Sequence, residues 1–301
     1  MQVCALTSPQ GKPAHKSYGD RVELKVTKYR VEQRVAVIQL SRPERRNAWT
    51  GRMHAEFRHC CAMAEQDSEV RVVVVHGDPE GRAFCVGADS DALAGHVERG
   101  GYDDGLTGLT GLSGQSLAEP GAGAHPFTDA HFAWQLGLRV PMIAAINGAC
   151  AGVALAVVSY CDLRFVAHDA VMATAAPKLG LPAEYGLSWI LPRLISRMHA
   201  TDLLLSGRRF TGAEAHHLGF AFDAGTPDQT VDQAMSYARI LAHEVAPSSL
   251  TTTKRQLLLD LLRHDVGASV READELLGVA MQQPDFVEGV AALRARRPPV
   301  F

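Results

Sequence analysis

The stretch that most constrains the fold is the apolar run over residues 140–158, which reads VPMIAAINGACAGVALAVV. The run is apolar enough to suggest a membrane span, but Pro141 and the pair Asn147-Gly148 interrupt it. We therefore interpret it as a buried strand, a turn and a buried helix. Small residues surround the predicted helix start near Gly152, so another backbone or a ligand can contact the main chain there. A helix N-terminus also presents unpaired N–H donors, which is typical of a binding site, although tight packing alone would also explain the pattern.

The first two-thirds of the chain alternate strand and helix patterns. Apolar runs bounded by polar residues or proline predict strands over residues 35–40, 70–76, 142–146 and 163–167. Helical spacing predicts helices over residues 50–67, 129–138, 200–205, 213–218, 231–245, 249–262 and 268–281. This order indicates the α/β class, with a core of strands and helices followed by a helical C-terminal region.

These patterns divide the chain into three parts. Residues 1–18 are predicted to form a flexible tail, residues 19–215 an α/β core and residues 216–301 a C-terminal helical region. Within the core, residues 100–123 are rich in glycine and show no sustained period. They predict a long loop beside a functional cleft, and we expect that loop to influence which substrate is accepted.

Charge and cysteine content argue against several functions. The net charge of -3 disfavours a general nucleic-acid binder. The N-terminus lacks the apolar stretch of a signal peptide, and none of the six cysteines forms a C-x-x-C pair. We expect reduced, mostly buried thiols in a cytoplasmic protein without membrane contact. No metal site is expected, because His125, Asp129 and His131 do not share one helix face.

A second segment that could carry chemistry is GRAFCVGAD over residues 81–89, which follows the strand predicted over residues 70–76. Here again an apolar strand leads into a Gly-Ala pair, with the carboxylate of Asp89 beside it. Taken alone, the segment favours a structural turn in which Asp89 accepts backbone hydrogen bonds.

Four motifs follow one another along the chain. They are RPERRNA over residues 42–48, AFCVGAD over 83–89, PMIAAING over 141–148 and the pair Cys161-Asp162. The ending, with DFVEGVAA over residues 285–292, completes the pattern. Together these segments resemble the enoyl-CoA hydratase/isomerase (crotonase) family, from about residue 20 to the C-terminus.

The resemblance implies a crotonase-like spiral of ββα turns, with a C-terminal helical region that assembles homotrimers or homohexamers. It also implies an acyl-CoA thioester as substrate, without a separate cofactor because coenzyme A is part of that substrate. By motif position, the backbone N–H groups of Ala88 and Val153 would form an oxyanion hole that stabilises a thioester enolate. Each well-placed donor of this kind contributes about 2.7–4 kcal/mol.

The resemblance also implies where coenzyme A would bind. The contacts would fall on Arg42 or Arg45, on Gly152 and on the backbone of Ala83, Cys85, Val86, Gly87, Ala88 and Asp89. The alternative for Arg42, Arg45 and Arg46 is a solvated basic turn. Lys254, Arg296 and Arg297 could reach a phosphate from the C-terminal helices, or could serve those helices alone.

The two glutamates with which hydratases of this family activate water would fall on Ala156 and Ala176. Alanine cannot move protons, and a positioned acid or base contributes about 10²–10⁴-fold. One carboxylate remains nearby, Glu184, whose apolar neighbours would raise its pKa and suit it to shuttle a proton. The alternative is that Glu184 caps the helix beginning near Gly186. Tyr185 is a weaker candidate.

The expected function is that of an acyl-CoA enzyme of the enoyl-CoA hydratase/isomerase type, in fatty-acid or related acyl-CoA metabolism. With one acid, a proton shift along the acyl chain is chemically easier than the addition of water. The alternative is a catalytically silent acyl-CoA-binding homologue, because alanines stand where the usual glutamates would be.

Overall fold

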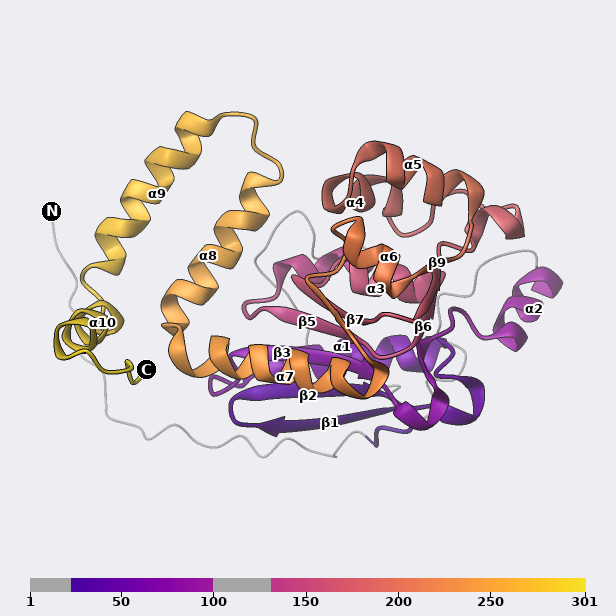
Figure 1. The fold of residues 1–301 in the computed structure, drawn as a ribbon, viewed down its shortest axis with the longest axis horizontal. Helices are drawn as coiled ribbons and strands as arrows, with labels where there is room; N and C mark the ends of the chain where they lie inside the picture. The colour runs from indigo at the N-terminus through magenta and orange to yellow at the C-terminus, as the bar shows by residue number, and fades with distance from the viewer. Residues whose placement is uncertain (1–22, 100–130) are drawn as a thin grey trace, which may run out of the picture.

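The strands form two sheets in the computed structural model, which describes residues 23–99 and 131–301 (Figure 1). The larger sheet contains β1 (Thr27–Glu32), β2 (Val35–Leu40), β3 (Val72–Gly77), β5 (Met142–Ile146), β7 (Leu163–Ala167) and β10 (Asp223–Gly225), in that order. The smaller sheet contains β4 (Ala83–Cys85), β6 (Ala149–Ala151), β8 (Val171–Ala173) and β9 (Phe210–Thr211). The β1–β2 and β8–β9 pairs are antiparallel, and the other neighbours are parallel.

Helices follow the strands in a regular alternation. The α-helices are α1 (Gly51–Gln66), α2 (Ser90–Arg99), α3 (Val153–Ser159), α4 (Leu187–Leu194), α5 (Arg197–Ser206), α6 (Gly212–His217), α7 (Pro227–Glu244), α8 (Pro247–Asp260), α9 (Val266–Ala280) and α10 (Pro284–Ala295). The 3-10 helices are η1 (Pro43–Arg45), η2 (Pro79–Gly81), η3 (Phe132–Gly137) and η4 (Ala176–Leu179). The pairs β3–β4, β5–β6 and β7–β8 each place one strand in each sheet and are followed by helices. This repeat confirms the predicted α/β spiral of ββα turns.

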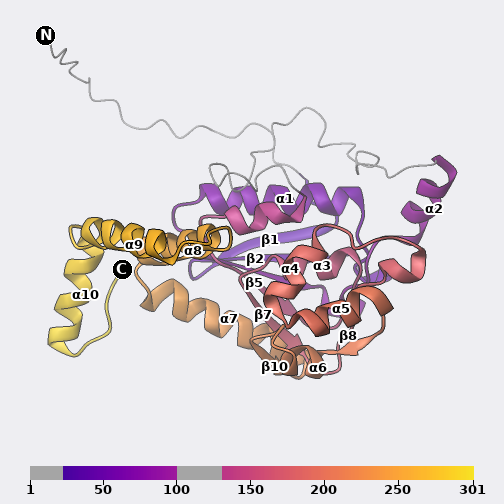
Figure 2. The ribbon, with the colours of Figure 1, turned by 90° about the horizontal axis from the view of Figure 1, so that it is seen from above.

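The larger sheet has an apolar core on each face. Alternate residues of β2 divide between the cores, with Ile38 on one face and Val37 on the other, because side chains alternate along a strand. Helices α1 and α7 lie on opposite sides of this sheet (Figure 2). Helix α7 begins with Pro227 after a capping box between Thr226 and Gln229, and its buried alanines pack on the sheet.

The predicted strands over residues 35–40, 142–146 and 163–167 match β2, β5 and β7. The elements that the sequence patterns do not predict include β1, β10 and α10, the short strands β6, β8 and β9, and helix α2. The described part of residues 129–138 contains the 3-10 helix η3, so the helix predicted there is present in a shorter, 3-10 form. The predicted tail over residues 1–18 and loop over residues 100–123 lie outside the described residues.

The apolar run over residues 140–158 forms β5, a turn, the short strand β6 and α3, in agreement with its interpretation as strand, turn and buried helix. Over residues 23–99 and 131–301, no helix has the length and apolar character needed to cross a lipid bilayer.

The predicted C-terminal region over residues 216–301 has two structurally different portions. Strand β10 and helix α7 pack with the larger sheet, whereas α8–α10 extend away from it as an arm (Figure 1). We call residues 247–295 the C-terminal arm. Helix α9 has no buried residue, although it carries the apolar side chains Val266, Val270 and Leu277. The arm therefore presents apolar surface that the rest of residues 23–99 and 131–301 leaves exposed.

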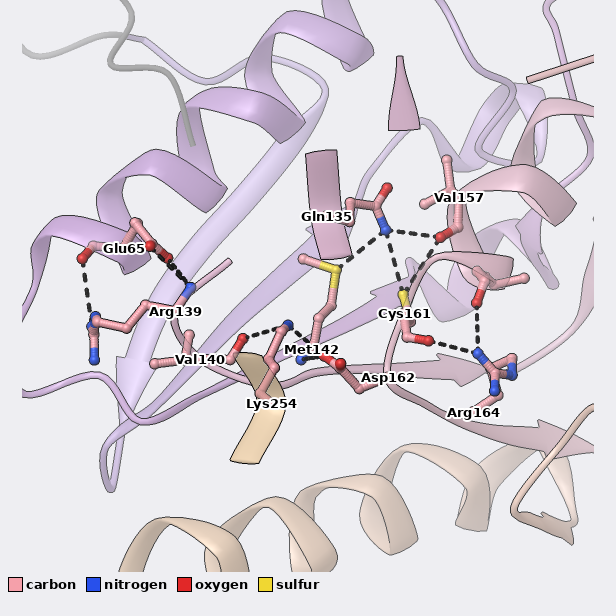
Figure 3. A network of polar contacts seen from close by, with 11 residues as sticks. Glu65, Gln135, Arg139, Val140, Met142, Val157, Cys161, Asp162, Arg164 and Lys254 are labelled. Carbon is pink, nitrogen blue, oxygen red and sulfur yellow. Dashed lines mark hydrogen bonds and ion pairs between the residues drawn. The ribbon is translucent and has the colours of Figure 1, made fainter. Parts of the chain in front are cut away.

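Lys254 attaches the arm to the core (Figure 3). Its side chain is only 7% exposed, and its Nζ donates to the carbonyl oxygen of Val140 at 3.0 Å and to Asp162 Oδ2 at 2.6 Å. The same carboxylate oxygen accepts the N–H of Met142 at 2.7 Å. The suggested phosphate contact of Lys254 is therefore wrong, because this side chain is buried in an ion pair.

Replacing Lys254 with Met is expected to lower the free energy of unfolding by about 1–3 kcal/mol, since it leaves Val140 and Asp162 without their charged donor. Denaturant titration measures this loss. Hydrogen exchange should also accelerate in α8. Arg255→Met, at the exposed neighbouring position of the same helix, is the control, and an equal effect of both substitutions would contradict the anchoring role.

Candidate active site

The segment around Gly87 and Ala88 is held by Trp49. The N–H of Trp49 donates to the carbonyl oxygen of Gly87 at 2.8 Å, and the N–H of Asp89 donates to the carbonyl oxygen of Trp49 at 2.9 Å. Trp49 thus forms a parallel bridge with Ala88 by bonding to the residues on either side of it. Because main-chain groups alternate in direction along extended chain, the N–H of Ala88 points away from Trp49.

The second segment is the start of α3. Gly152 adopts φ +54° and donates its N–H to the carbonyl oxygen of Ala173 at 3.0 Å. Val153 follows as the first residue of α3, so its N–H has no acceptor within the helix. The left-handed conformation of Gly152 is one that glycine adopts at little cost.

These two segments lie against each other. A Cβ atom built on Gly87, which has φ +103°, would lie 3.0 Å from the carbonyl oxygen of Ala151. A Cβ atom on Gly152 would lie 3.8 Å from Cα of Gly87. The glycines therefore allow the two main chains to come close together. The residues after them, Ala88 and Val153, are the two predicted oxyanion donors.

Arg42 and Arg45 have different surroundings. Arg42 is 17% exposed, and its Nη1 donates to the carbonyl oxygen of Ala48 at 2.8 Å and to Asp89 Oδ2 at 2.9 Å. Arg45 is 47% exposed and pairs with the exposed Asp91. Arg42 therefore stabilises the turn before Trp49, whereas the guanidinium of Arg45 is exposed to solvent.

Asp89 accepts hydrogen bonds from both sides of its turn. Its Oδ1 accepts the N–H of Asp91 at 2.9 Å, and its Oδ2 accepts from Arg42. Burial raises the pKa of Asp89, but the hydrogen bonds from Arg42 and Asp91 more than offset this and hold that pKa below its usual value. This carboxylate is thus ionised and committed to the turn, rather than poised as a base.

The remaining residues of this segment differ in what they can offer a ligand. The side chains of Ala83 and Cys85 are fully buried, whereas Val86 is half-buried. Burial raises the pKa of the Cys85 thiol to about 12, so it stays protonated at neutral pH. Ala83 and Cys85 are buried as whole residues, main chain included, so the predicted contacts of coenzyme A with these two residues are not open to a ligand. The parts of this segment that a ligand can reach lie at Val86 and Ala88.

Ala156 and Ala176 are both buried, on α3 and at the start of η4. No acid stands at either position, so these sites cannot supply a proton-transferring carboxylate.

Glu184 is half-buried in the segment between η4 and α4. Burial raises the pKa of its carboxyl group. Among the described residues, no hydrogen bond or ion pair engages this carboxylate, and α4, which follows the N-cap residue Gly186, has no side-chain cap. The alternative that Glu184 caps α4 is therefore not what the structure shows, and the carboxylate is left for another use.

A cluster of rings connects the Glu184 segment with Trp49. The ring of Phe132 lies 5.3 Å from that of Tyr185, 5.6 Å from that of Trp49 and 5.2 Å from that of His54, measured between centroids. Trp49, His54, Phe57, Phe132 and Tyr185 form what we call the aromatic cluster. Of these residues, the sequence pattern indicates only Tyr185 as a candidate, although Trp49 directly follows the RPERRNA motif.

Burial, together with the charges of Arg58 and His131, lowers the pKa of His54 to about 4. The folded state therefore keeps His54 neutral below pH 6.5, where the unfolded chain takes up a proton. Stability contributed by the neutral ring should be lost as the pH falls from 6.5 towards 4. In His54→Gln, the unfolding free energy should differ less between pH values above this window and within it than it does in the wild type. A variant with the same pH dependence as the wild type would contradict the assignment.

A groove of about 620 Å³ lies beside the Glu184 segment, between that segment and the helices α4 and α5. Its lining includes Pro177, Leu181, Ala183, Arg197 and Leu205. None of the predicted site residues lines it. The groove therefore borders the candidate active site without containing its proposed chemistry.

No group of His, Cys, Asp and Glu suited to hold a metal ion occurs within residues 23–99 and 131–301. His125 and Asp129, two of the three residues considered as metal ligands, lie outside the described residues.

Comparison with known proteins identifies the family of this chain. The sequence matches the Enoyl-CoA hydratase/isomerase family over residues 30–118 and 123–301. It is 29% identical over 281 residues to 1,2-epoxyphenylacetyl-CoA isomerase of Escherichia coli, covering 90% of this chain and 96% of that protein. It is 32% identical over 272 residues to a probable enoyl-CoA hydratase of Mycobacterium tuberculosis, covering 89% of each.

The structure agrees with these sequence matches. A crystal structure of a probable enoyl-CoA hydratase/isomerase from Mycobacterium abscessus superposes with a TM-score of 0.76 at 27% identity, covering 91% of this chain and 98% of that one. The chain has the fold of acyl-CoA enzymes of this class. It belongs to the enoyl-CoA hydratase/isomerase family, which confirms the resemblance drawn from its motifs.

Proposed function

We propose that the chain holds the thioester carbonyl oxygen of an acyl-CoA between the N–H groups of Ala88 and Val153. The main support is the close approach of Gly87 to Gly152, which brings the two donor segments together. Backbone donors do not depend on side-chain identity, so valine at position 153 is compatible with a donor there. Two such donors stabilise the negative charge that develops on the oxygen in an enolate.

For the reaction, we propose migration of the double bond of a 3-enoyl-CoA. The Glu184 carboxylate takes a proton from C2, and the electrons of that C–H bond form the enolate whose oxygen the two N–H groups hold. The carboxylic acid then returns the proton to C4, which leaves the double bond between C2 and C3. The raised pKa and unengaged carboxylate of Glu184 suit this shuttle. The isomerase named among the relatives is compatible with it.

A second candidate is a catalytically silent acyl-CoA-binding protein. The buried alanines Ala156 and Ala176 favour it, because they stand where two proton-transferring glutamates would be expected.

Purified protein tested with crotonyl-CoA and with a 3-enoyl-CoA distinguishes these functions. Isomerisation of the 3-enoyl-CoA, with hydration of crotonyl-CoA slower by about 10²-fold or more, supports the proposed reaction. Binding of both esters without turnover supports the silent protein. Failure to bind either ester would contradict both.

For coenzyme A itself, we propose that Arg45 contacts a phosphate and that the backbone at Val86 and Ala88 contacts the adenine end. The exposed guanidinium of Arg45 supports this choice over Arg42, which is already bonded within its turn. Arg45→Gln should raise KM for an acyl-CoA with little change in kcat, because the phosphate does not take part in the chemistry.

We further propose a cytoplasmic homotrimer or homohexamer acting in fatty-acid or related acyl-CoA metabolism. The uncovered apolar residues of the C-terminal arm support assembly, and five described free cysteines suit a reducing compartment. Light scattering of the purified chain gives the oligomeric state, and a monomer would contradict this part of the proposal.

A further inference from the structure

One hydrogen bond joins the oxyanion helix α3 to the Glu184 segment. Tyr160 forms the C-terminal cap of α3, and its side chain is buried, with 3% exposure. Its hydroxyl donates to the carbonyl oxygen of Tyr185 at 2.7 Å. Tyr185 directly follows Glu184, so the bond is made to the backbone that carries the proposed proton shuttle.

The backbone of the acceptor residue, Tyr185, and of the residue after it is in an unusual conformation. Tyr185 has φ +52° and Gly186 has φ +72°, both in the left-handed region. A non-glycine residue is held there only when surrounding contacts compensate for the strain. The Tyr160 hydroxyl supplies one such contact, and the packing of the Tyr185 ring on Phe132 supplies another.

The hydroxyl also occupies the space beside Gly186. A Cβ atom built on Gly186 would lie 2.4 Å from the oxygen of Tyr160. Only glycine fits at this distance, so the turn after Glu184 is shaped around the Tyr160 hydroxyl.

Helix α3 is itself rigidly held. All its residues from Val153 to Ser159 are buried. At its C-terminal end, Gln135 donates to the carbonyl oxygen of Val157 at 2.9 Å, and Arg164 donates to that of Cys161 at 2.6 Å (Figure 3). The helix therefore provides a fixed connection between the N–H of Val153 at one end and the hydroxyl of Tyr160 at the other.

We propose that Tyr160 is a positioning residue whose hydroxyl holds the Glu184 segment at a fixed distance from the oxyanion donor of Val153. The inference rests on the proposed function, in which Glu184 moves the proton. In this arrangement α3 serves both parts of the site. The N–H of Val153, which would stabilise the charge on the thioester oxygen, lies at one end of the helix, and the Tyr160 hydroxyl, which would position the Glu184 carboxylate, lies at the other.

Burial raises the pKa of Tyr160 to about 12, so its hydroxyl remains a donor throughout the range in which a carboxyl group titrates. Burial is also the cause that raises the pKa of Glu184, without a contribution from a neighbouring charge. Movement of this segment towards water should therefore lower the pKa of Glu184 towards its ordinary value of 4.5.

Tyr160→Phe tests the proposal, because it removes only the hydroxyl oxygen. We expect kcat for the 3-enoyl-CoA to fall by about 10- to 100-fold, as for other displacements of a catalytic group, with KM changed less than about twofold. In the Glu184→Gln background, the same substitution should change kcat by less than about twofold, because Tyr160 acts through Glu184. Tyr237→Phe, on α7 at the opposite face of the larger sheet, is the matched control.

A second measurement does not depend on turnover. Carbon NMR of labelled glutamate, with Glu184→Gln used for assignment, gives the pKa of Glu184 in wild type and in Tyr160→Phe. A lowered pKa in the variant supports the positioning role. An unchanged pKa, or an equal loss of kcat in the presence and absence of Glu184, overturns it. Full turnover by Glu184→Gln would instead refute the proposed reaction. In that case the NMR result alone would decide whether Tyr160 positions the Glu184 segment.

Discussion

Replacing Glu184 with Gln is expected to slow migration of the double bond by about 10²–10⁴-fold, the contribution of a positioned acid or base. Glutamine has nearly the same size but cannot take up and return a proton. Because the side-chain carboxylate of Glu184 makes no hydrogen bond or ion pair within the described residues, the substitution should leave the unfolding free energy almost unchanged. Initial rates with a 3-enoyl-CoA measure the effect, and Glu69→Gln at an exposed position is the control.

The pH dependence of the wild-type enzyme provides an independent check on this assignment. The carboxylate must be ionised to remove the proton from C2, and burial raises its pKa. The kcat/KM should therefore fall on the acid side with an apparent pKa above the usual 4.5 of a glutamate. Turnover that Glu184→Gln leaves intact would remove this residue from the mechanism.

Val153→Pro is expected to reduce kcat by about 10²–10³-fold, because proline has no N–H to donate to the enolate oxygen. Proline is tolerated at the first position of a helix, where the N–H has no intrahelical acceptor. Val153 occupies this position in α3, so the backbone donor can be removed without interrupting a helical hydrogen bond. Initial rates and circular dichroism together separate a lost donor from a lost fold.

The matched control for this substitution is Val153→Ala, which shortens the side chain and keeps the N–H. It should retain kcat within about tenfold, since the donor is unchanged. Equal losses in the proline and alanine variants would mean that the side chain, and not the backbone donor, matters at this position.

Much of the core could be predicted because its strands are buried on both faces. The runs VAVIQL and MIAAI are almost wholly apolar, so the sequence predicts β2 and β5 with their observed bounds. Strand β1 has the sequence TKYRVE with largely polar, exposed residues and owes its form to antiparallel pairing with β2. Strand β10 has only three residues, and its extended form depends on parallel pairing with β7. Neither has a local pattern that marks a strand.

The candidate site likewise has features that the sequence predicts and contacts that it does not. Gly87 and Gly152 could be found because each follows a strand within a recognisable motif. The bond from Tyr160 to Tyr185 joins residues 25 apart, and the ion pair of Lys254 with Asp162 joins residues 92 apart. Such contacts depend on the completed fold, and a tyrosine or lysine in a helical pattern does not reveal its distant acceptor. Sequence alone therefore could not distinguish a phosphate contact of Lys254 from a buried anchor.

The most direct test of the central claim is a titration with acetoacetyl-CoA, whose enolate absorbs in the near ultraviolet. If Ala88 and Val153 hold the thioester oxygen, the wild-type protein should bind this ester saturably and increase its enolate fraction. Val153→Pro should lose that increase, whereas Val153→Ala should keep it. Absence of binding, or binding with the same enolate fraction in wild type and Val153→Pro, would contradict the account.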